Sequence, residues 1–404
     1  MAGEPGEATL AGSAVPKGPG PDAAAAVHVR DLTVSFPTPE GPLPAVAGVS
    51  LDLARGQITG LVGESGSGKS TLALTLLNAV PAPGYVASGS VIIDDVGDVL
   101  ALRRPALRRV RGAKIGYVFQ ASQNSLNPLK PVGKQVLDLG RSHGVRDLRE
   151  FLHGARLLID EMGLDAERVL ASYQHELSGG MRQRVGIVLA LVLNAHVLIL
   201  DEPTTALDTL TQSSVLEIIR KVHAERQLTT LIISHDVGVI GDLADRMAVM
   251  YAGRVVEEGP TAEVLAAPKH PYTRGLLTAM PRIAGDIAAA RPLPGRVPDL
   301  ASVPRQGCVF RPRCPLATAV CATAEPASTV LGDRRFACHV AAGRPRDRGT
   351  VDRQDVRRAP GNAGAGVRPG AARRRFHHPR PGCGVVHRGV GLWQDNAGAD
   401  PVRP

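Results

Sequence analysis

The chain has 404 residues, of which 44% are hydrophobic, so it is long enough to bury a core and a wholly disordered chain is excluded. Its formal net charge of +9 comes mostly from the arginines of residues 341–404, and the remainder is close to neutral, which excludes a basic nucleic-acid-binding face there. The longest apolar run, 185–200, is interrupted by two polar residues and is too short to span a membrane. Residues 1–26 lack the basic start and apolar core of a signal peptide, so we expect a disordered tail and a cytoplasmic protein.

Strand-like and helix-like segments alternate after this tail. The strand-like runs are residues 28–36, 49–53, 58–62, 115–119, 197–200 and 231–233. The helix-like runs are residues 71–77, 134–139, 148–162 and 184–193. This alternation predicts an α/β protein with a mostly parallel sheet and helices around it.

The first motif with a clear chemistry lies between a predicted strand and a predicted helix. It reads Gly63-Glu64-Ser65-Gly66-Ser67-Gly68-Lys69-Ser70, is followed by Thr71, and fits the phosphate-loop pattern G-x-x-x-x-G-K-[ST]. The glycines let successive N–H groups point at phosphates, Lys69 reaches the β- and γ-phosphates, and Ser70 ligates Mg²⁺. A glycine-rich turn without a ligand is the alternative, and the flanking strand and helix disfavour it. The motif therefore predicts a site for ATP and Mg²⁺.

The second motif is the apolar run 197–200, which ends in two carboxylates. Asp201 is predicted to hold the Mg²⁺ shell, and Glu202 is predicted to polarise the water that attacks the γ-phosphate. A buried strand with a solvated acidic end would show the same pattern. The phosphate loop elsewhere in the chain favours the catalytic interpretation.

A third segment lies between these two motifs, immediately before a helical pattern. It reads Leu177-Ser178-Gly179-Gly180-Met181-Arg182-Gln183 and resembles the signature of ATP-binding-cassette (ABC) ATPases. In that family the segment binds the γ-phosphate of the ATP held by the opposing subunit. The resemblance implies this role for Leu177, Ser178, Gly179, Gly180 and Gln183, because a helix that opens on Ser and Gly presents N–H donors to an anion.

Four further residues match ABC positions in chain order. Phe36 resembles the aromatic residue that stacks on adenine, although a lone Phe on a strand is often a core residue. Gln120 matches the Q-loop glutamine, which contacts Mg²⁺ and the attacking water, and Asp208 matches the D-loop aspartate. His235 matches the switch histidine that contacts the γ-phosphate, whereas a His at a strand end is otherwise usually structural.

Two segments resemble the dipeptide, oligopeptide and nickel importer branch of this family: residues 125–128, Ser-Leu-Asn-Pro, and residues 270–273, His-Pro-Tyr-Thr. Ala121 and Ser122 depart from the acidic or proline-containing pair that the branch commonly has. The resemblance implies a P-loop NTPase fold with a RecA-like core, an antiparallel β subdomain and a helical signature subdomain. We expect this domain over 27–265, with the helical part at about 121–180, and a small C-terminal extension over 266–340.

Four cysteines of the extension resemble the cysteine motif of the same branch. They are Cys308, Cys314, Cys321 and Cys338. Four thiolates could ligate an iron–sulfur cluster or Zn²⁺, and their spacings, longer than those of zinc ribbons, favour the cluster. The alternative is that these thiols are ordinary residues of a docking extension.

Residues 341–404 are a biased mixture of Arg, Gly, Ala and Pro, for which we expect disorder. Reading reverse-translated residues 389–402 one base forward permits the peptide Glu-Ser-Gly-Ser-Gly-Lys-Thr-Thr-Leu-Ala-Arg-Thr-Leu, a second phosphate loop with its helix. We therefore hypothesise that the chain is a frameshifted, truncated form of a tandem two-cassette protein. Sequencing the gene tests this, and an intact frame with different codons would contradict it.

Together these motifs predict an ATP-binding and ATP-hydrolysing subunit that energises import of peptides or a similar small solute. The resemblance implies a second cassette, membrane permease subunits and an extracytoplasmic solute-binding protein as partners, a peripheral place on the cytoplasmic face of the membrane, and no nucleic acid. One alternative is a soluble ABC ATPase of translation or DNA maintenance, which the lack of coiled-coil insertions disfavours. The other is an inactive truncated cassette.

Overall fold

The computed structural model describes residues 25–120, 126–279 and 293–341, all within one compact unit, Met1–Pro345. The two predicted tails, with the frameshift hypothesis, therefore lie outside the described residues except for positions 25, 26 and 341. Residues 121–125 also lie outside the described residues, and they include Ala121 and Ser122, which depart from the importer pattern.

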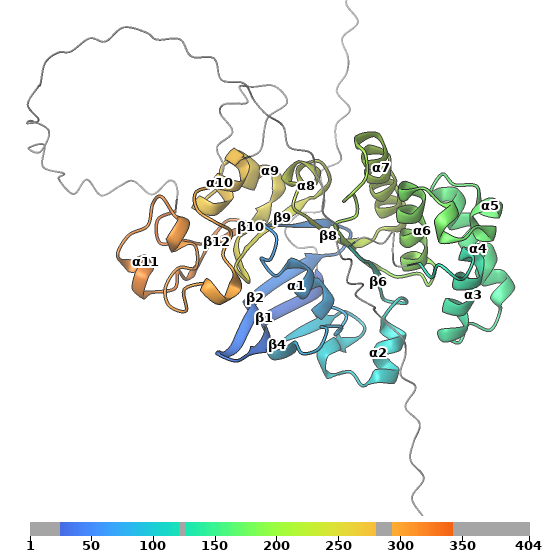
Figure 1. Cartoon of the computed structure of the whole chain (residues 1–404), viewed down its shortest axis with the longest axis horizontal. Coiled ribbons are helices and arrows are strands. Elements are labelled where there is room, and N and C mark those ends of the chain that lie inside the picture. Colours follow the sequence, from blue (N-terminus) through green and yellow to red (C-terminus); the bar gives the residue numbers. More distant parts are fainter. Residues whose placement is uncertain (1–24, 121–125, 280–292, 342–404) are drawn as a thin grey trace, which may run out of the picture. The chain divides into compact units, whose positions relative to one another are not determined.

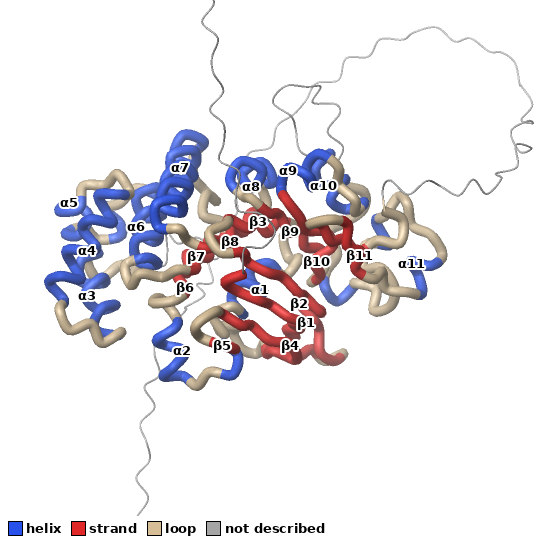
Figure 2. The backbone as a smooth tube through the Cα atoms, turned by 180° about the vertical axis from the view of Figure 1, so that it is seen from behind, coloured by secondary structure: helices blue, strands red, loops and turns tan. Residues whose placement is uncertain are grey.

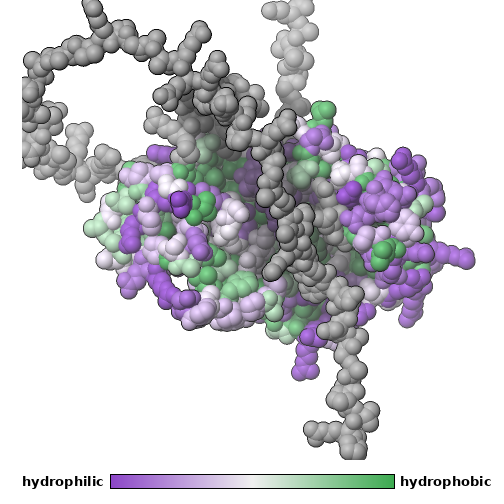
Figure 3. Space-filling view, in the orientation of Figure 1, coloured by the Kyte–Doolittle hydropathy of each residue, from purple (hydrophilic) through white to green (hydrophobic). Residues whose placement is uncertain are grey.

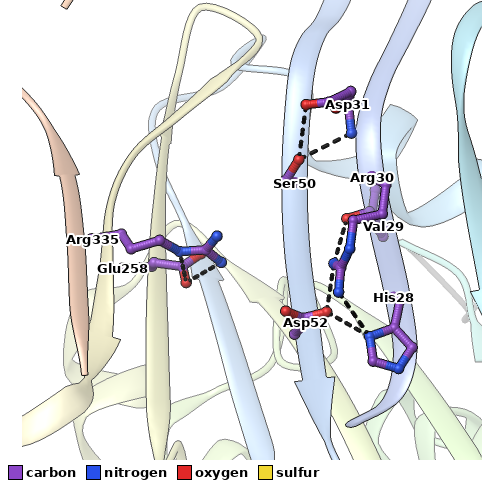
Figure 4. A network of polar contacts seen from close by, with 8 residues as sticks. All are labelled: His28, Val29, Arg30, Asp31, Ser50, Asp52, Glu258 and Arg335. Atoms are coloured by element: carbon purple, nitrogen blue, oxygen red, sulfur yellow. Dashed lines mark hydrogen bonds and ion pairs between the residues drawn. The ribbon is translucent and has the colours of Figure 1, made fainter. Parts of the chain in front are cut away.

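A four-stranded antiparallel sheet opens the described chain, with the strand order β2-β1-β4-β5. The strands are β1 (Ala25–Thr38), β2 (Gly41–Ala54), β4 (Tyr85–Ile93) and β5 (Gly97–Asp98), and a short 3₁₀ turn (Val99–Ala101) follows. Asp52 on β2 fixes the pairing with β1, because its Oδ1 lies 2.6 Å from Arg30 Nη1 and 2.8 Å from His28 Nδ1 (Figure 4). The predicted strands 28–36 and 49–53 are thus parts of one longer hairpin, in which β-bulges break the alternation of buried and exposed residues.

The main sheet has eight strands among the described residues, in the order β11-β12-β10-β9-β3-β8-β7-β6. The parallel part comprises β6 (Ile115–Val118), β7 (Val197–Asp201), β8 (Thr229–Ser234), β3 (Ile58–Val62) and β9 (Arg246–Tyr251). Every residue of β3, β7 and β8 is buried, as expected for parallel strands with both faces covered. The prediction of an α/β fold with a mostly parallel sheet is confirmed for this part.

Helices lie on both faces of the sheet and gather at one of its ends (Figures 1 and 2). Those beside the sheet are α1 (Lys69–Thr75), α2 (Arg104–Val110), α7 (Thr209–Arg226), α8 (Val237–Leu243) and α9 (Thr261–Ala266). The end group is α3 (Val132–Ser142), α4 (Leu148–Glu161), α5 (Ala166–Ala171), a 3₁₀ turn (Gln174–Glu176) and α6 (Gly179–Leu191). Mostly hydrophilic residues cover the face of this end seen in Figure 3, and many of its apolar side chains belong to the buried core.

The C-terminal extension adds strands to the main sheet beside β10 (Arg254–Pro260), the last strand of the preceding domain. The hairpin of β11 (Ser328–Leu331) and β12 (Arg334–Ala337) adds to it, since β12 pairs antiparallel with β10. Between them lie α10 (Pro271–Ala279), α11 (Val320–Thr323) and two 3₁₀ turns (Leu300–Ser302 and Arg311–Arg313). The extension therefore shares the sheet of the preceding domain.

Buried aromatic rings form the small core of the extension. Tyr251 at the end of β9 lies against Tyr272 of α10, with ring centroids 4.6 Å apart, and against the edge of Phe310 at 5.1 Å. All three side chains are almost fully buried. Such aromatic contacts add to the burial of apolar area and hold the extension against the carboxyl end of β9.

Candidate nucleotide site

The predicted phosphate loop lies between the end of β3 and the start of α1. Gly63 and Gly68 have φ values of 156° and 100°, which L side chains rarely adopt. A Cβ atom would lie 2.2 Å from Met250 O at Gly63 and 2.2 Å from Ala45 O at Gly68. The tight curl of this loop therefore requires glycine at both positions.

Lys69 is buried beneath the loop. Its Nζ donates to the carbonyl oxygens of Gly63 at 2.8 Å and Glu64 at 2.9 Å. Burial lowers the pKa of Lys69, and the negative charges of Glu202, Asp201 and Glu64 oppose that shift. The loop thus holds a cation in place with backbone acceptors, and this cation can transfer its hydrogen bonds to phosphate oxygens.

Asp201, at the carboxyl end of β7, is held by two hydroxyl groups. Ser70 Oγ donates to its Oδ1 at 3.2 Å, and Tyr117 on β6 donates to its Oδ2 at 3.0 Å. Burial raises the pKa of Asp201, and both hydrogen bonds oppose that rise. A hydroxyl and a carboxylate oxygen in contact are the oxygen donors that Mg²⁺ prefers, so the predicted ligands Ser70 and Asp201 fit this ion.

Glu202 follows directly, in a left-handed backbone conformation with φ 49°. Its Oε2 accepts hydrogen bonds from Gln120 Nε2 at 2.9 Å and from Thr205 Oγ1 at 3.0 Å, and its Oε1 lies 3.3 Å from His235 Nδ1. The three residues predicted to be catalytic are therefore brought together. Gln120, predicted also as a Mg²⁺ ligand, contacts Glu202 in this arrangement.

The signature segment forms the start of α6. Ser178 is its N-cap, with Oγ accepting from the N–H of Met181 at 3.3 Å, while Leu177 and Gln183 are buried. A Cβ at Gly180 would lie 2.4 Å from Thr211 Cγ2, so the start of α6 packs closely against the start of α7.

The D-loop aspartate begins α7, the helix against which the signature packs. Asp208 is the N-cap, and its carboxylate accepts from both the N–H (3.0 Å) and the hydroxyl (2.6 Å) of Thr211. These hydrogen bonds lower the pKa of Asp208. The two predicted dimer-facing segments therefore meet at Thr211.

Phe36, the predicted adenine partner, is half-buried on β1 near the hairpin turn. It pairs with Leu43 across the hairpin. Its ring lies against Gly84, where a Cβ would be 2.6 Å from Phe36 Cε1. Phe36 therefore has one face supported by the backbone of the β subdomain.

Tyr117 and Arg313 were not predicted as site residues. The sequence signal for Tyr117 is its hydroxyl group within the otherwise apolar strand 115–118. A buried tyrosine hydroxyl needs a hydrogen-bond partner, which here is a carboxylate of the site. Arg313 forms an ion pair with Glu64 of the phosphate loop, 249 positions away in sequence. No local pattern could have indicated that contact.

The four cysteines predicted to ligate an iron–sulfur cluster line one small cavity of the extension, together with Phe310 and Arg311. They are Cys308, Cys314, Cys321 and Cys338. Burial raises the pKa of the Cys308 and Cys314 thiols, and it raises that of Cys338 to about 11. No group of three His, Cys, Asp or Glu side chains in the described ranges is arranged to hold a metal ion. The cavity has a volume of only about 10 Å³, so the described residues form no open site for either a single ion or a cluster.

A separate cavity of about 470 Å³ lies between the β1–β2 hairpin and the extension. Its arginines are already paired, Arg335 with Glu258 and Arg254 with Glu325 (Figure 4 shows the first pair). Of the predicted site residues only Cys308 lines it. The residues predicted to bind nucleotide therefore do not line this cavity.

Comparison with known proteins identifies the family of the chain. Residues 46–205 match the ABC transporter family, and residues 256–321 match the oligopeptide/dipeptide transporter C-terminal region. The chain belongs to the ATP-binding proteins of ABC transporters and is an ATPase of that family, as the motifs predicted.

Its relatives place it more narrowly. It is 41% identical over 313 residues to a putative peptide import ATP-binding protein of Brucella melitensis, covering 74% of this chain and 92% of the relative. It is 39% identical to the dipeptide transport ATP-binding protein DppD of Caldanaerobacter subterraneus subsp. tengcongensis (79% and 98% covered) and 42% identical to the probable D,D-dipeptide transport ATP-binding protein DdpD of Escherichia coli (77% and 95%).

Solved structures show the same fold. The dimeric structure of a bacterial ABC transporter cassette superposes with a TM-score of 0.51 at 28% identity, covering 58% of this chain and 98% of that one. A dimeric post-hydrolysis state of the same cassette, bound to ADP and Pi, gives 0.50 at 29% identity, with the same coverage. Within the described ranges, no helix has the length and apolarity needed to cross a membrane.

Proposed function

We propose that this chain uses ATP binding and hydrolysis to drive the import of dipeptides or oligopeptides. It acts as one of two cassettes on the cytoplasmic face of the membrane, with permease subunits and an extracytoplasmic solute-binding protein. The observation that carries the ATPase part is the convergence of Gln120, Thr205 and His235 on Glu202, directly after Asp201. The printed names of the relatives support the peptide part.

The chain's own residues account for the chemistry. Lys69 and the loop N–H groups bind the β- and γ-phosphates, and Ser70 and Asp201 hold Mg²⁺, which neutralises phosphate charge when bound. Glu202 accepts a proton from the attacking water, whose oxygen forms a bond to the γ-phosphorus as the bond to ADP breaks. His235, with a side chain 61% exposed, stands beside Glu202 on the open side.

Pairing follows from the position of the signature. The N-terminus of α6, where Gly179 and Gly180 follow the cap Ser178, presents N–H groups that favour an anion, and Asp208 caps the neighbouring helix α7. We infer that they complete the ATP site of a second cassette, as the resemblance implies. Leu210, 84% exposed at the start of α7, is an apolar side chain that pairing would cover.

The permease contact is proposed for the surface beside the Q-loop. Leu129 is 84% exposed, Phe119 is 49% exposed and Tyr173 is 38% exposed. An open hollow of about 380 Å³ is lined by Pro128, Gln174, His175 and Arg182. Exposed apolar residues around a hollow are typical of a docking site for another protein.

We further propose that the four thiols of the extension hold an iron–sulfur cluster. The gathering of all four thiols around one small cavity supports this, and binding would release protons because a thiol ligates iron only after it loses its proton. Iron and sulfide assays and visible absorption of anaerobically purified chain, beside Cys314→Ser, test it. Colourless wild-type protein after reconstitution with iron and sulfide would contradict it.

The transport proposal is tested by peptide uptake in the host organism. The gene is deleted and restored as wild type or as Glu202→Gln, and uptake of a radiolabelled dipeptide is compared with uptake of the free amino acid. We expect dipeptide uptake to be lost on deletion, restored by wild type and not restored by Glu202→Gln. Unchanged dipeptide uptake in the deletion strain would contradict the proposal.

A further inference from the structure

A side chain of the C-terminal extension contacts the phosphate loop directly. Arg313 forms a bidentate ion pair with Glu64, with Nη1 2.6 Å from Oε2 and Nη2 2.9 Å from Oε1. Both partners are shielded from solvent, with side chains 5% and 17% exposed. Paired, planar hydrogen bonds of this kind are strong and fix orientation as well as distance.

The extension holds Arg313 independently of Glu64. Its Nε donates to the carbonyl oxygen of Pro294 at 2.8 Å, and its guanidinium lies 5.8 Å from the centroid of the Tyr251 ring. Gly295 leaves room for the side chain, because a Cβ there would lie 3.2 Å from Arg313 Cγ. The guanidinium is thus pre-positioned, and Glu64 is the group that it orients.

Other residues of the extension contact the same end of the loop. The N–H of Glu64 donates to Tyr272 Oη on α10 at 2.9 Å. Val297 and Pro298 line a small hollow together with the loop residues 64–67. Both the backbone and the side chain of Glu64 are therefore held from the extension.

An unpaired carboxylate at this position would oppose ATP binding. Glu64 belongs to a loop that receives the negative phosphates, and it is close enough to Lys69 to affect that cation electrostatically. In a partly buried site the repulsion between like charges is weakly screened. A neutralising partner for Glu64 therefore favours binding of an anion to the loop.

We propose that Arg313 is a positioning residue for ATP binding, which neutralises Glu64 and holds it clear of the phosphates. Arg313 belongs to the cysteine-bearing extension and directly precedes Cys314, which lines the thiol cavity. Through Arg313 the extension therefore affects the affinity of the cassette for nucleotide. The role concerns affinity for nucleotide and does not depend on which solute is moved.

Equilibrium binding of MgATP to the purified full chain tests this proposal. We expect Arg313→Ala to weaken binding about tenfold, and Arg313→Ala with Glu64→Gln to return the dissociation constant to within about twofold of the Glu64→Gln variant. Arg335→Ala is the matched control, because Arg335 also ties the extension to the sheet, through Glu258, without contacting the loop (Figure 4). We expect its affinity to equal that of wild type.

Two results would overturn the proposal. One is wild-type affinity in Arg313→Ala, and the other is equal weakening by Arg313→Ala and by the double variant, because a merely structural role would not be rescued by removing the Glu64 charge. If Arg313→Ala does not fold, Arg313→Gln with and without Glu64→Gln gives the same contrast, and equal dissociation constants would overturn the proposal.

Discussion

The nucleotide site and the C-terminal extension hold their polar groups by different means. In the nucleotide site, Asp201 ends a strand whose residues are all buried and Glu202 follows it. Their partners Tyr117 and His235 belong to β6 and to the residues directly after β8. In the extension, α10 and several turns of three or four residues are held by aromatic rings and by ion pairs such as Arg313 with Glu64. A sheet fixes its site through many backbone bonds, whereas the extension depends on a few side chains, so single substitutions there can act at a distance.

After the loss of Glu202, the largest effect on ATP hydrolysis is expected from a change at Tyr117 in the nucleotide site. Tyr117→Phe removes one of the two hydroxyl donors to Asp201, which lets the pKa of this carboxyl rise further. Loss of such a partner costs roughly tenfold or more in metal affinity or activity. We expect the Mg²⁺ concentration for half-maximal hydrolysis to rise about tenfold, and to rise more at low pH because Asp201 is then protonated more readily.

Titration of hydrolysis with Mg²⁺ at two pH values measures this effect. Tyr85→Phe, which alters an exposed tyrosine of β4, is the control. Equal half-saturation in Tyr117→Phe and wild type at both pH values would show that the sheet holds Asp201 without help from this hydroxyl.

A smaller effect is expected in the extension, from His270. Burial lowers its pKa to about 3, and its Nδ1 accepts the N–H of Tyr272. Between this value and the ordinary pKa of about 6.5 the unfolded chain binds the proton and the folded chain does not, so stability falls as the pH falls. The loss should approach about 1.4 kcal/mol per pH unit within that window.

Urea unfolding at about pH 7.5 and about pH 5.5 checks this, with the free energies of wild type and His270→Asn compared at both pH values. Asn can accept the same hydrogen bond and does not titrate, so the variant should lose less stability on acidification. His153→Asn, at an exposed position of α4, is the control. An identical pH dependence of wild type and His270→Asn would mean that His270 takes up its proton in the folded state.

The same contrast explains how far the sequence predicted the molecule. The phosphate loop, the carboxylates after β7 and the signature were predictable because each is a local motif between a recognisable strand and helix. The catalytic role of Gln120 was predicted only from the family resemblance, and its contact with Glu202 was not predicted. The pairing of β12 with β10 and the reach of Arg313 to Glu64 join residues far apart in sequence, and no periodicity encodes them.

The central claim is that two cassettes pair over ATP and that Glu202 is the carboxylate that drives hydrolysis. Its most direct test is ATP hydrolysis by purified wild type and Glu202→Gln, together with gel filtration of both in MgATP. The account predicts that wild type hydrolyses ATP, and that the variant is at least about 100-fold slower and elutes as an ATP-dependent dimer. Hydrolysis by Glu202→Gln at the wild-type rate, or a variant that stays monomeric with ATP bound, would contradict it.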